Sequence, residues 1–406
     1  MCGISGYCGK EGSNEKLVKM TTAISRRGPD DVGFYESKDV GFGFRRLSII
    51  DLTTGHQPLS DEDNNIWVML NGEIYDYKKL REELIEIGYK FKTKSDTEVI
   101  VHAYKEYGEE CFKKLDGMFS IALWDSKKSK LFLARDRFGK KPLYWTLQKN
   151  TIWFASELKS LISADVIKKE IDMDSIALYF RNEFIPTPKT IFKNVWKLEP
   201  ATVLSFENGK IEKREFWQKK EEEEKDLNEK DVLEKTQKII DEAVKKRLVS
   251  DVPLGLFLSG GLDSTIIAES ASRQNPGIEA FTLGFEDNSY DETEKARKIA
   301  KALGIKHHVE ILSEKKALDM LDESINLLDE PLADPAVLPQ LLLSQFTKKH
   351  VTVALSGDGG DELLLGYQHI KAHIWVEKLS FLPKNILNLT ADILKKIPSG
   401  SEYFSF

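Results

Sequence analysis

The sequence predicts two domains of different class: an α+β domain with layered antiparallel sheets, and an α/β domain with a parallel sheet. A chain of 406 residues is longer than one hydrophobic core normally supports. Strand patterns dominate the first half, whereas strands and helices alternate in the second. We therefore expect domains at 1–217 and 232–406, joined by a charged linker at 218–231.

Short runs rich in aromatic and β-branched residues predict the strands of the first domain. Gly, Asp, Pro or Asn bounds each run, as is usual for strands; the runs are VGFGFRRLSIID, IWVMLNGEIY, FSIALWD, KLFLARD, PLYWTL and TIWFASE. Two segments, YKKLREELIEIG and DTEVIVHAYKEYG, instead have apolar spacing near 3.6 and end at Gly, so they predict helices.

The stretch KKEEEEKDLNEKD at 219–231 carries a charge on 11 of its 13 residues. Such a run predicts a solvated linker or a helix lead-in, and a functional acidic patch is the less favoured interpretation.

Beyond this stretch, helical and strand patterns alternate up to the strand VTVALSG. In the helix DETEKARKIAKALG, one apolar stripe is formed by Ala296, Ile299, Ala300 and Leu303. Alternation of this kind predicts a parallel sheet covered by helices, with ligands at the carboxyl ends of the strands. The loops just after the strands are therefore the candidate functional loops.

Composition favours a soluble globular protein with small-molecule partners. The net charge of −7 argues against a nucleic-acid surface, and no apolar run reaches the roughly 18 residues of a membrane span. Cys2, Cys8 and Cys111 match neither a disulfide framework nor a zinc motif. We expect a cytoplasmic location, with a homodimer as the candidate assembly.

The loop FLSGGLDST at 257–265 predicts an anion site. Ser259, Gly260 and Gly261 join a buried strand to a helix opening at Leu262, so backbone N–H groups and a positive helix end meet there. Asp263 could hold Mg²⁺ against phosphates. The alternative is an ordinary turn whose polar residues open a helix.

A second loop, LSGDGGDE at 355–362, repeats these features after a later strand. Its carboxylates are Asp358, Asp361 and Glu362. Two such loops at neighbouring strand ends would provide carboxylates for Mg²⁺ and backbone groups for a triphosphate. Neither loop has the P-loop or dinucleotide-binding glycine pattern.

In the first half, Cys2 lies in MCGISGY, directly behind a removable Met. After removal of Met1, the free α-amino group of Cys2, with an ordinary pKa near 7.7–8.0, could act as the base for its thiol. The alternative is a small packed residue.

The other polar candidates of this half suit an α-amino acid. Arg46 could grip a carboxylate, and Glu73 or Asp96 could bind an ammonium group. The Asn71 side chain and the Gly72 N–H would suit an oxyanion hole. Taken singly, each residue favours an ordinary structural role: a surface ion pair for Arg46, a hairpin turn for Asn71-Gly72 and a helix N-cap for Asp96.

Read together, the motifs resemble the glutamine-hydrolysing asparagine synthetases along nearly the whole chain. They occur in the order MCGISGY, RRGPDD, RRLSIIDL, NGEIYDY, SDTEV, GMFSIALWD, ARDRFGKKPLYW, FASELKSL, SGGLDS, SYDE, LDEPLADPA and LSGDGGDEL. That family joins an N-terminal-nucleophile glutaminase domain to a synthetase domain of the ATP-pyrophosphatase type.

The resemblance implies a role for each matching residue. Cys2 would be the nucleophile, freed by removal of Met1, with Asn71 and Gly72 stabilising the oxyanion. The glutamine-binding positions would be Arg46, Leu47, Ser48, Ile49, Ile50, Asn71, Gly72, Glu73 and Asp96. The ATP-binding positions would be Leu258, Ser259, Gly260, Gly261, Asp263, Ser264, Leu283, Ser356 and Gly357, with Asp263 and Asp361 as Mg²⁺ ligands and Asp358 linked to adenylation of aspartate.

The implied reaction releases ammonia from glutamine and adds it to aspartate activated as its β-carboxyl adenylate, giving asparagine, AMP and pyrophosphate. A related amidotransferase acting on another carboxylate or on a sugar precursor remains an alternative. Family members usually continue past this C-terminus, so a truncated chain that keeps only glutaminase or binding function is a further alternative.

The pair His307-His308 alternates faces on a predicted strand, which favours packing over metal binding.

Overall fold

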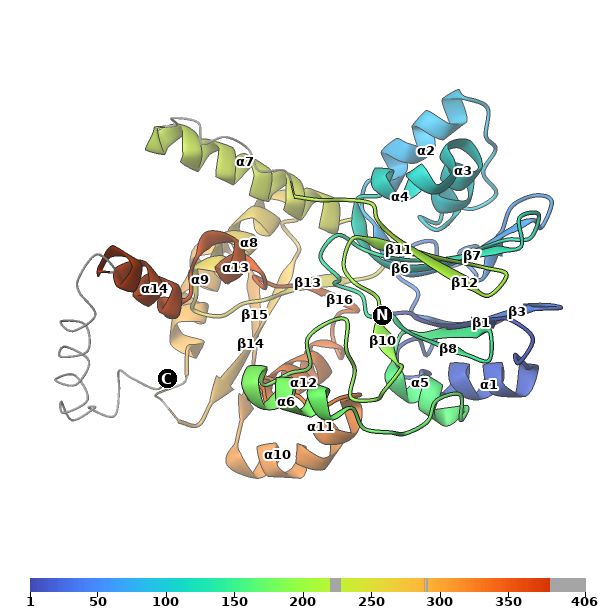
Figure 1. The fold of residues 1–406 in the computed structure, drawn as a ribbon. Coiled ribbons are helices and arrows are strands. Elements are labelled where there is room, and N and C mark those ends of the chain that lie inside the picture. Colours follow the sequence, from blue (N-terminus) through green and yellow to red (C-terminus); the bar gives the residue numbers. More distant parts are fainter. Residues whose placement is uncertain (220–227, 288, 290, 380–406) are drawn as a thin grey trace.

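The computed structural model describes residues 1–219, 228–287, 289 and 291–379 (Figure 1). The predicted fold class is confirmed: all strand pairs of the first half are antiparallel, and those of the second half are parallel. Within these residues no helix has both the length and the apolar character that a membrane crossing requires.

Two six-stranded sheets stack face to face in the first half (Figure 1). The first sheet has the order β10-β8-β9-β1-β3-β2, formed by Trp196–Lys197, Tyr144–Gln148, Thr151–Ala155, Gly3–Cys8, Val40–Arg46 and Asp31–Ser37. The second has the order β12-β11-β7-β6-β5-β4, formed by Lys210–Glu215, Thr202–Glu207, Lys130–Arg135, Gly117–Asp125, Ile66–Ile74 and Leu59–Ser60.

Helices cover the outer faces of both sheets, which gives four layers. Large apolar side chains from both inner faces, such as Phe42 and Phe154 from the first sheet and Leu133 from the second, form the central core. The first sheet is covered by α1 (Asn14–Ala23) and α5 (Leu158–Ser163), followed by α6 (Met173–Asn182); the second is covered by α2 (Tyr77–Glu86), α3 (Glu98–Tyr107), the short 3₁₀ turn Gly108–Glu110 and α4 (Cys111–Lys114). This double sandwich places the start of β1 at one end of the central core.

The second half contains a four-stranded parallel sheet in the order β15-β14-β13-β16. Its strands are Lys306–Leu312, Glu279–Phe285, Leu254–Phe257 and Val353–Leu355. Its helices are α7 (Glu229–Arg247), α8 (Leu262–Gln274), α9 (Thr293–Leu303), α10 (Glu314–Asp319), α11 (Leu321–Leu327), α12 (Val337–Thr347), α13 (Gly360–Leu364) and α14 (Gln368–Leu379).

Local sequence signals explain several of these boundaries. Helix α9 ends at Gly304, which takes the left-handed conformation with a φ of +68°. Within α9, Ala296 and Ala300 of the predicted apolar stripe are fully buried. The side chain of Asn228 accepts a hydrogen bond from the N–H of Asp231 and so caps α7.

Some sequence predictions fall on residues that the structure does not describe. Residues 220–227 of the predicted linker, Tyr290 of the SYDE motif and residues 380–406 lie outside the described ranges. The last part of the predicted linker, 229–231, belongs to α7.

Candidate active sites

Cys2 lies just before β1, at one end of the double sandwich. Its thiol is held by the backbone of Leu47: Sγ lies 3.6 Å from the carbonyl oxygen, to which it donates, and 3.4 Å from the amide nitrogen, which donates to it. Burial raises the pKa of the Cys2 thiol, while the backbone hydrogen bond from Leu47 opposes this rise. The thiol is therefore protonated near neutral pH unless a neighbouring base takes the proton.

A small cavity of about 60 Å³ opens beside this thiol. Its walls include most of the first-half site residues that the sequence suggested: Cys2, Arg46, Leu47, Ile49, Ile50, Asn71, Gly72, Glu73 and Asp96. Ser48 is not among the lining residues; its backbone N–H instead donates to Asp30 at 2.8 Å.

Asn71 and Gly72 lie inside strand β5, so the alternative of a hairpin turn is wrong. The side-chain nitrogen of Asn71 donates to the hydroxyls of Ser120 (3.2 Å) and Ser156 (3.4 Å), while its amide oxygen is buried with no partner among the described residues. Gly72 has a φ of +151°, and a Cβ there would lie 1.9 Å from the carbonyl oxygen of Met118. Only glycine fits at this bend of the strand.

Arg46 is buried, with 4% of its surface exposed, so the alternative of a surface ion pair is also wrong. Its Nη2 donates to the carbonyl oxygens of Ile50 (3.2 Å) and Asp51 (2.6 Å). A guanidinium carries five N–H donors, which leaves donors for a ligand.

Two buried carboxyl groups lie across the same cavity. Asp96 accepts a hydrogen bond from the N–H of Ile74 at 3.0 Å, and burial raises its pKa to about 7. It does not cap a helix, because Thr97 is the N-cap residue of α3. Burial also raises the pKa of Glu73, an effect that the nearby Lys141 ammonium opposes.

Sequence reasoning did not single out Lys141, which lines the cavity and is 6% exposed. Its Nζ donates to the sulfur of Met1 at 3.0 Å, and burial lowers its pKa. Lys141 lies in the motif ARDRFGKKPLYW, but this local sequence gives no reason to select Lys141 over Lys140 as a site residue.

A second and larger cavity, of about 850 Å³, lies at the carboxyl ends of β13, β14 and β16. Its walls combine both predicted loops: Leu258, Ser259, Gly261, Asp263 and Ser264 from the first, and Ser356, Gly357, Asp358, Asp361 and Glu362 from the second, with Leu283 from the end of β14. Gly260 is not among the lining residues. Thr282, Glu292 and Gln340 also line the cavity, although the sequence gave no reason to select them.

The two loops touch each other closely. A Cβ at Gly360 would lie 2.4 Å from Oδ2 of Asp263, so any larger residue there would displace the Asp263 carboxylate. The hydroxyls of Ser259 and Ser264 lie 2.9 Å apart, and the N–H of Gly260 donates to a carboxylate oxygen of Glu292 at 3.2 Å. An anionic oxygen thus already binds one of the backbone donors of this loop, as expected at a helix N-terminus.

Acidic side chains from the two loops also face each other. The pKa of Asp263 is raised, chiefly by burial and then by the negative charges of Asp361 and Glu362. Carboxylate groups that repel one another and lie beside a polar cavity suit a hard divalent cation such as Mg²⁺. Asp358 is exposed at the same cavity.

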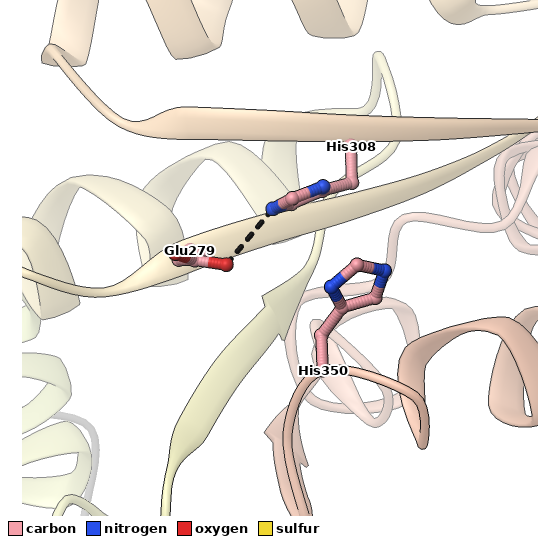
Figure 2. A group of neighbouring side chains, drawn as sticks. All are labelled: Glu279, His308 and His350. Carbon is pink, nitrogen blue, oxygen red and sulfur yellow. Dashed lines mark hydrogen bonds and ion pairs between the residues drawn. The ribbon is translucent and has the colours of Figure 1, made fainter.

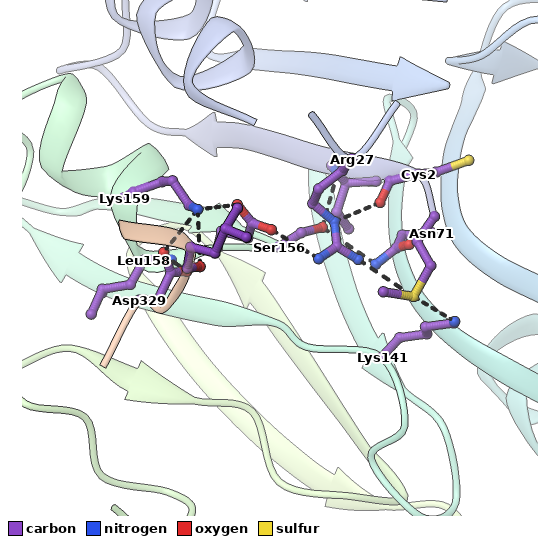
Figure 3. A network of polar contacts seen from close by, with 12 residues as sticks. Cys2, Arg27, Asn71, Lys141, Ser156, Leu158, Lys159 and Asp329 are labelled. Atoms are coloured by element: carbon purple, nitrogen blue, oxygen red, sulfur yellow. Dashed lines mark hydrogen bonds and ion pairs between the residues drawn. The ribbon is translucent and has the colours of Figure 1, made fainter. Parts of the chain in front are cut away.

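Polar contacts join the surroundings of Cys2 to the second half (Figure 3). The Nε of Arg27 donates to the carbonyl oxygen of Cys2 at 2.8 Å, and its Nη1 pairs with Glu157 at 3.0 Å. Glu157 in turn pairs with Lys159 at 3.0 Å, and Lys159 lies 3.5 Å from Asp329. Each half therefore contributes charges to one network that ends at the backbone of Cys2.

The chain has close relatives of known family. Residues 1–217 match the family model of the glutamine amidotransferase domain, and residues 235–399 match that of asparagine synthase. Asparagine synthetase (glutamine-hydrolyzing) 1 of Bacillus subtilis is 39% identical over 98% of this chain and 64% of the relative. Putative asparagine synthetase (glutamine-hydrolyzing) 2 of Methanocaldococcus jannaschii is 36% identical over 95% of this chain and 78% of the relative.

A third relative, the putative asparagine synthetase (glutamine-hydrolyzing) of Mycobacterium tuberculosis, is 34% identical over 98% of this chain and 65% of the relative. The chain thus spans slightly less than two thirds of the length of the Bacillus and Mycobacterium relatives.

Proposed function

Because the chain belongs to the family of glutamine-hydrolysing asparagine synthetases, we propose that its first half releases ammonia from glutamine and its second half adds that ammonia to aspartate at the expense of ATP. The products would be asparagine, AMP and pyrophosphate, which makes the chain a carbon–nitrogen ligase. The observation that carries the proposal is the cavity beside Cys2, where a thiol, a guanidinium and two carboxyl groups converge.

In the first half, Cys2 attacks the side-chain amide of glutamine once Met1 has been removed. The thiol needs a base, because burial raises its pKa. Burial at the chain end lowers the pKa of the Met1 amine to about 5. The same surroundings would keep an amine on Cys2 neutral, so that it could accept the thiol proton.

Asn71 and Gly72 stabilise the oxyanion of the tetrahedral intermediate. The hydroxyls of Ser120 and Ser156 can donate to the amide oxygen of Asn71 if the amide is turned by 180°, which pairs this buried oxygen. The amide nitrogen is then the free group, and it serves as an oxyanion donor.

Charge complementarity places the amino-acid end of glutamine. Nη2 of Arg46 donates to two backbone carbonyl oxygens, and its other N–H groups bind the α-carboxylate of glutamine. The ionised carboxylates of Asp96 and Glu73 bind the α-ammonium group. Leu47, Ile49 and Ile50 form the remaining wall, and Ser48 lies behind it in the same segment.

In the second half, the loop Ser259–Ser264 binds the pyrophosphate part of ATP, and Leu258, Leu283, Ser356 and Gly357 contact the nucleotide. Asp263 and Asp361 would hold Mg²⁺, which when bound neutralises phosphate charge during adenylation. Asp358 assists the formation of the aspartyl adenylate. The cavity of about 850 Å³ is large enough for ATP and aspartate together.

The two reactions can be separated with single variants. We expect Cys2→Ala to abolish glutamine-dependent pyrophosphate release and to leave ammonia-dependent release within about twofold of the parent, because the thiol serves only glutamine. Asp263→Asn should remove ATP-dependent chemistry and spare glutamine hydrolysis. Cys8→Ala is the matched control, since Cys8 lies buried at the far end of the same strand β1.

Equal loss of both activities in Cys2→Ala would overturn the division of labour. Mass spectrometry of the chain after reaction with a glutamine-like electrophile should show Met1 removed and the label on Cys2. A label on Cys8 or Cys111 would contradict the assignment.

The same assays separate the alternatives. Pyrophosphate release with another acid but not with aspartate would identify a related amidotransferase, and glutamine hydrolysis with no acceptor-dependent release would identify a chain with glutaminase or binding function alone.

Composition supports a cytoplasmic location and small-molecule partners. Light scattering tests for a homodimer, the candidate assembly.

A further inference from the structure

Three potential metal ligands gather at the edge of the parallel sheet opposite the ATP cavity. Glu279 opens β14, His308 is the third residue of β15, and His350 lies between α12 and β16 (Figure 2). These are the amino ends of the strands, whereas the predicted nucleotide loops follow their carboxyl ends. The cluster is therefore separate from the proposed Mg²⁺ site.

Strand register brings the first two ligands together. Glu279 pairs with Lys306 and Phe281 pairs with His308, so Glu279 and His308 are diagonal neighbours on one face of the sheet. Nε2 of His308 lies 2.8 Å from Oε2 of Glu279. His307 points to the other face, where its ring contacts the Thr282 hydroxyl at 2.7 Å, so the two histidines share no ligand.

The third ligand comes from the helix that covers this face. α12 packs on β14 and β15, and His350 follows its end, with its ring 4.5 Å from the ring of His308. No hydrogen bond to a ring nitrogen of His350 is present within the described part of the chain. His350 is exposed to solvent, and its ring also contacts those of Phe281 and Phe346, with centroids 5.4 and 5.6 Å away.

Neighbouring side chains orient the ligands. The ring of His308 stacks on Phe281 with centroids 5.0 Å apart and an angle of 9°, which fixes its plane. Lys306 binds the other oxygen of Glu279 at 2.8 Å, so that Oε2 faces His308. Such outer contacts hold the ligands of many metal sites in position.

The ligand atoms have separations that suit one ion. They all lie within 4.8 Å of one another. Three atoms this close lie within about 2.8 Å of a common point, and a Zn²⁺ ion binds nitrogen and oxygen at about 2.0–2.2 Å. Rotation of the exposed His350 ring can close much of the remaining gap.

We propose that Glu279, His308 and His350 form a binding site for a divalent transition metal, with Zn²⁺ as the preferred ion and water in the remaining coordination position. Two imidazoles and one carboxylate favour zinc over Mg²⁺, which prefers oxygen ligands. The ion would tie the end of α12 to β14 and β15. Because Ala336, Pro339 and Gln340 at the start of the same helix line the ATP cavity, the ion would also restrain one wall of that cavity.

Zinc titration of the full chain by calorimetry tests the site. The parent for this experiment is Cys2→Ala, treated with EDTA and exchanged into Mg²⁺ buffer, because a partly exposed thiol would itself bind zinc. We expect one zinc per chain, and a rise in Tm of about 5–10 °C when free zinc is near one hundred times Kd.

His350→Ala is the decisive variant, since the removal of an exposed ring should leave the fold intact. We expect His350→Ala, His308→Ala and Glu279→Gln each to weaken zinc binding by at least about tenfold. Loss of a residue that only orients a metal ligand already lowers metal affinity by about tenfold or more. The matched control is His307→Ala, one residue away on the opposite face, which should keep the affinity of the parent. Unchanged affinity in His350→Ala, or equal loss in His307→Ala, would overturn the proposal.

Discussion

The two cavities that hold the candidate sites differ in how their walls are built. The cavity beside Cys2 measures about 60 Å³, and its polar walls belong to the sandwich core: Asn71, Arg46 and Asp96 are 0%, 4% and 5% exposed. The cavity of the second half measures about 850 Å³, and it is lined by loops in which Ser259 and Asp358 are exposed.

The first site therefore depends on buried side chains of the first half, whereas the second depends on loops that follow parallel strands. The walls of the small cavity are also core residues, so a substitution there acts on packing and charge burial as well as on chemistry. The large cavity depends on backbone positions after parallel strands, where a side-chain change stays local.

The largest effect is expected at Gly72. We expect Gly72→Ala to lower glutamine hydrolysis by more than about 100-fold, because its Cβ would lie 1.9 Å from the carbonyl oxygen of Met118 and must displace β5 from β6. Ammonia-dependent pyrophosphate release should stay within about threefold. Assays of both activities on one preparation measure the difference.

Gly88→Ala is the control for this variant. Gly88 also has a positive φ, +106°, but a Cβ there would meet nothing within 4 Å. It should cost about 1 kcal/mol of unfolding free energy and leave both activities unchanged. Equal damage in the two variants would mean that backbone strain, and not the wall of the small cavity, determines the loss.

The next effect is a pH dependence set by Asp96. Burial raises its pKa to about 7, so the carboxyl group is increasingly protonated as the pH falls below 7. A neutral carboxyl cannot bind an ammonium group, and we therefore expect glutamine affinity to fall about tenfold per pH unit below pH 7. Calorimetry on the Cys2→Ala variant measures binding without turnover, and Asp96→Asn should bind weakly at every pH.

The same pKa shift has a consequence for stability. Asp96 is protonated in the folded chain up to about pH 7 but ionises near pH 4 when unfolded, so the unfolding free energy falls as the pH rises from about 4 to 7. The contribution amounts to about 4 kcal/mol, and it should be absent in Asp96→Asn. Urea unfolding at several pH values checks this, and a parent with the same slope as Asp96→Asn would contradict the buried proton.

Comparison with the sequence shows which features local patterns encode. The loops at Ser259–Ser264 and Ser356–Glu362 were predictable, because strand–helix alternation fixes where parallel strands end. The surroundings of Cys2 were not predictable from local rules, since the Asn71-Gly72 pair reads locally as a hairpin turn yet lies inside a strand. Only the order of many motifs together indicated that pocket.

Features that depend on packing between distant segments left no local signal. Lys141 reaches the small cavity from the segment after β7, and His350 reaches Glu279 only because α12 folds back over the sheet. The contacts between the two halves are of the same kind: Asp329 and Glu330 lie in the motif LDEPLADPA, whose sequence does not show that it docks on the first half.

The smallest effect concerns Glu330, a residue of the second half that contacts the first half. Its carboxylate accepts a hydrogen bond from the N–H of Ile191 at 2.8 Å and pairs with Lys197 at 2.6 Å, with 9% of its side chain exposed. Glu330→Gln keeps an acceptor but removes the charge beside a largely buried ammonium. We expect a loss of about 2 kcal/mol in the unfolding free energy of the docked halves, measured by urea unfolding.

The matched control is Glu323→Gln, which removes a second ion pair between the halves. Glu323 and Arg26 lie 3.7 Å apart with side chains 41% and 72% exposed, so solvent screens their attraction and the variant should change stability by less than about 1 kcal/mol. If the two variants lost equal stability, burial of Glu330 would not be what holds the halves together. If Glu330→Gln also lowered glutamine hydrolysis, docking of the second half would be part of what shapes the small cavity.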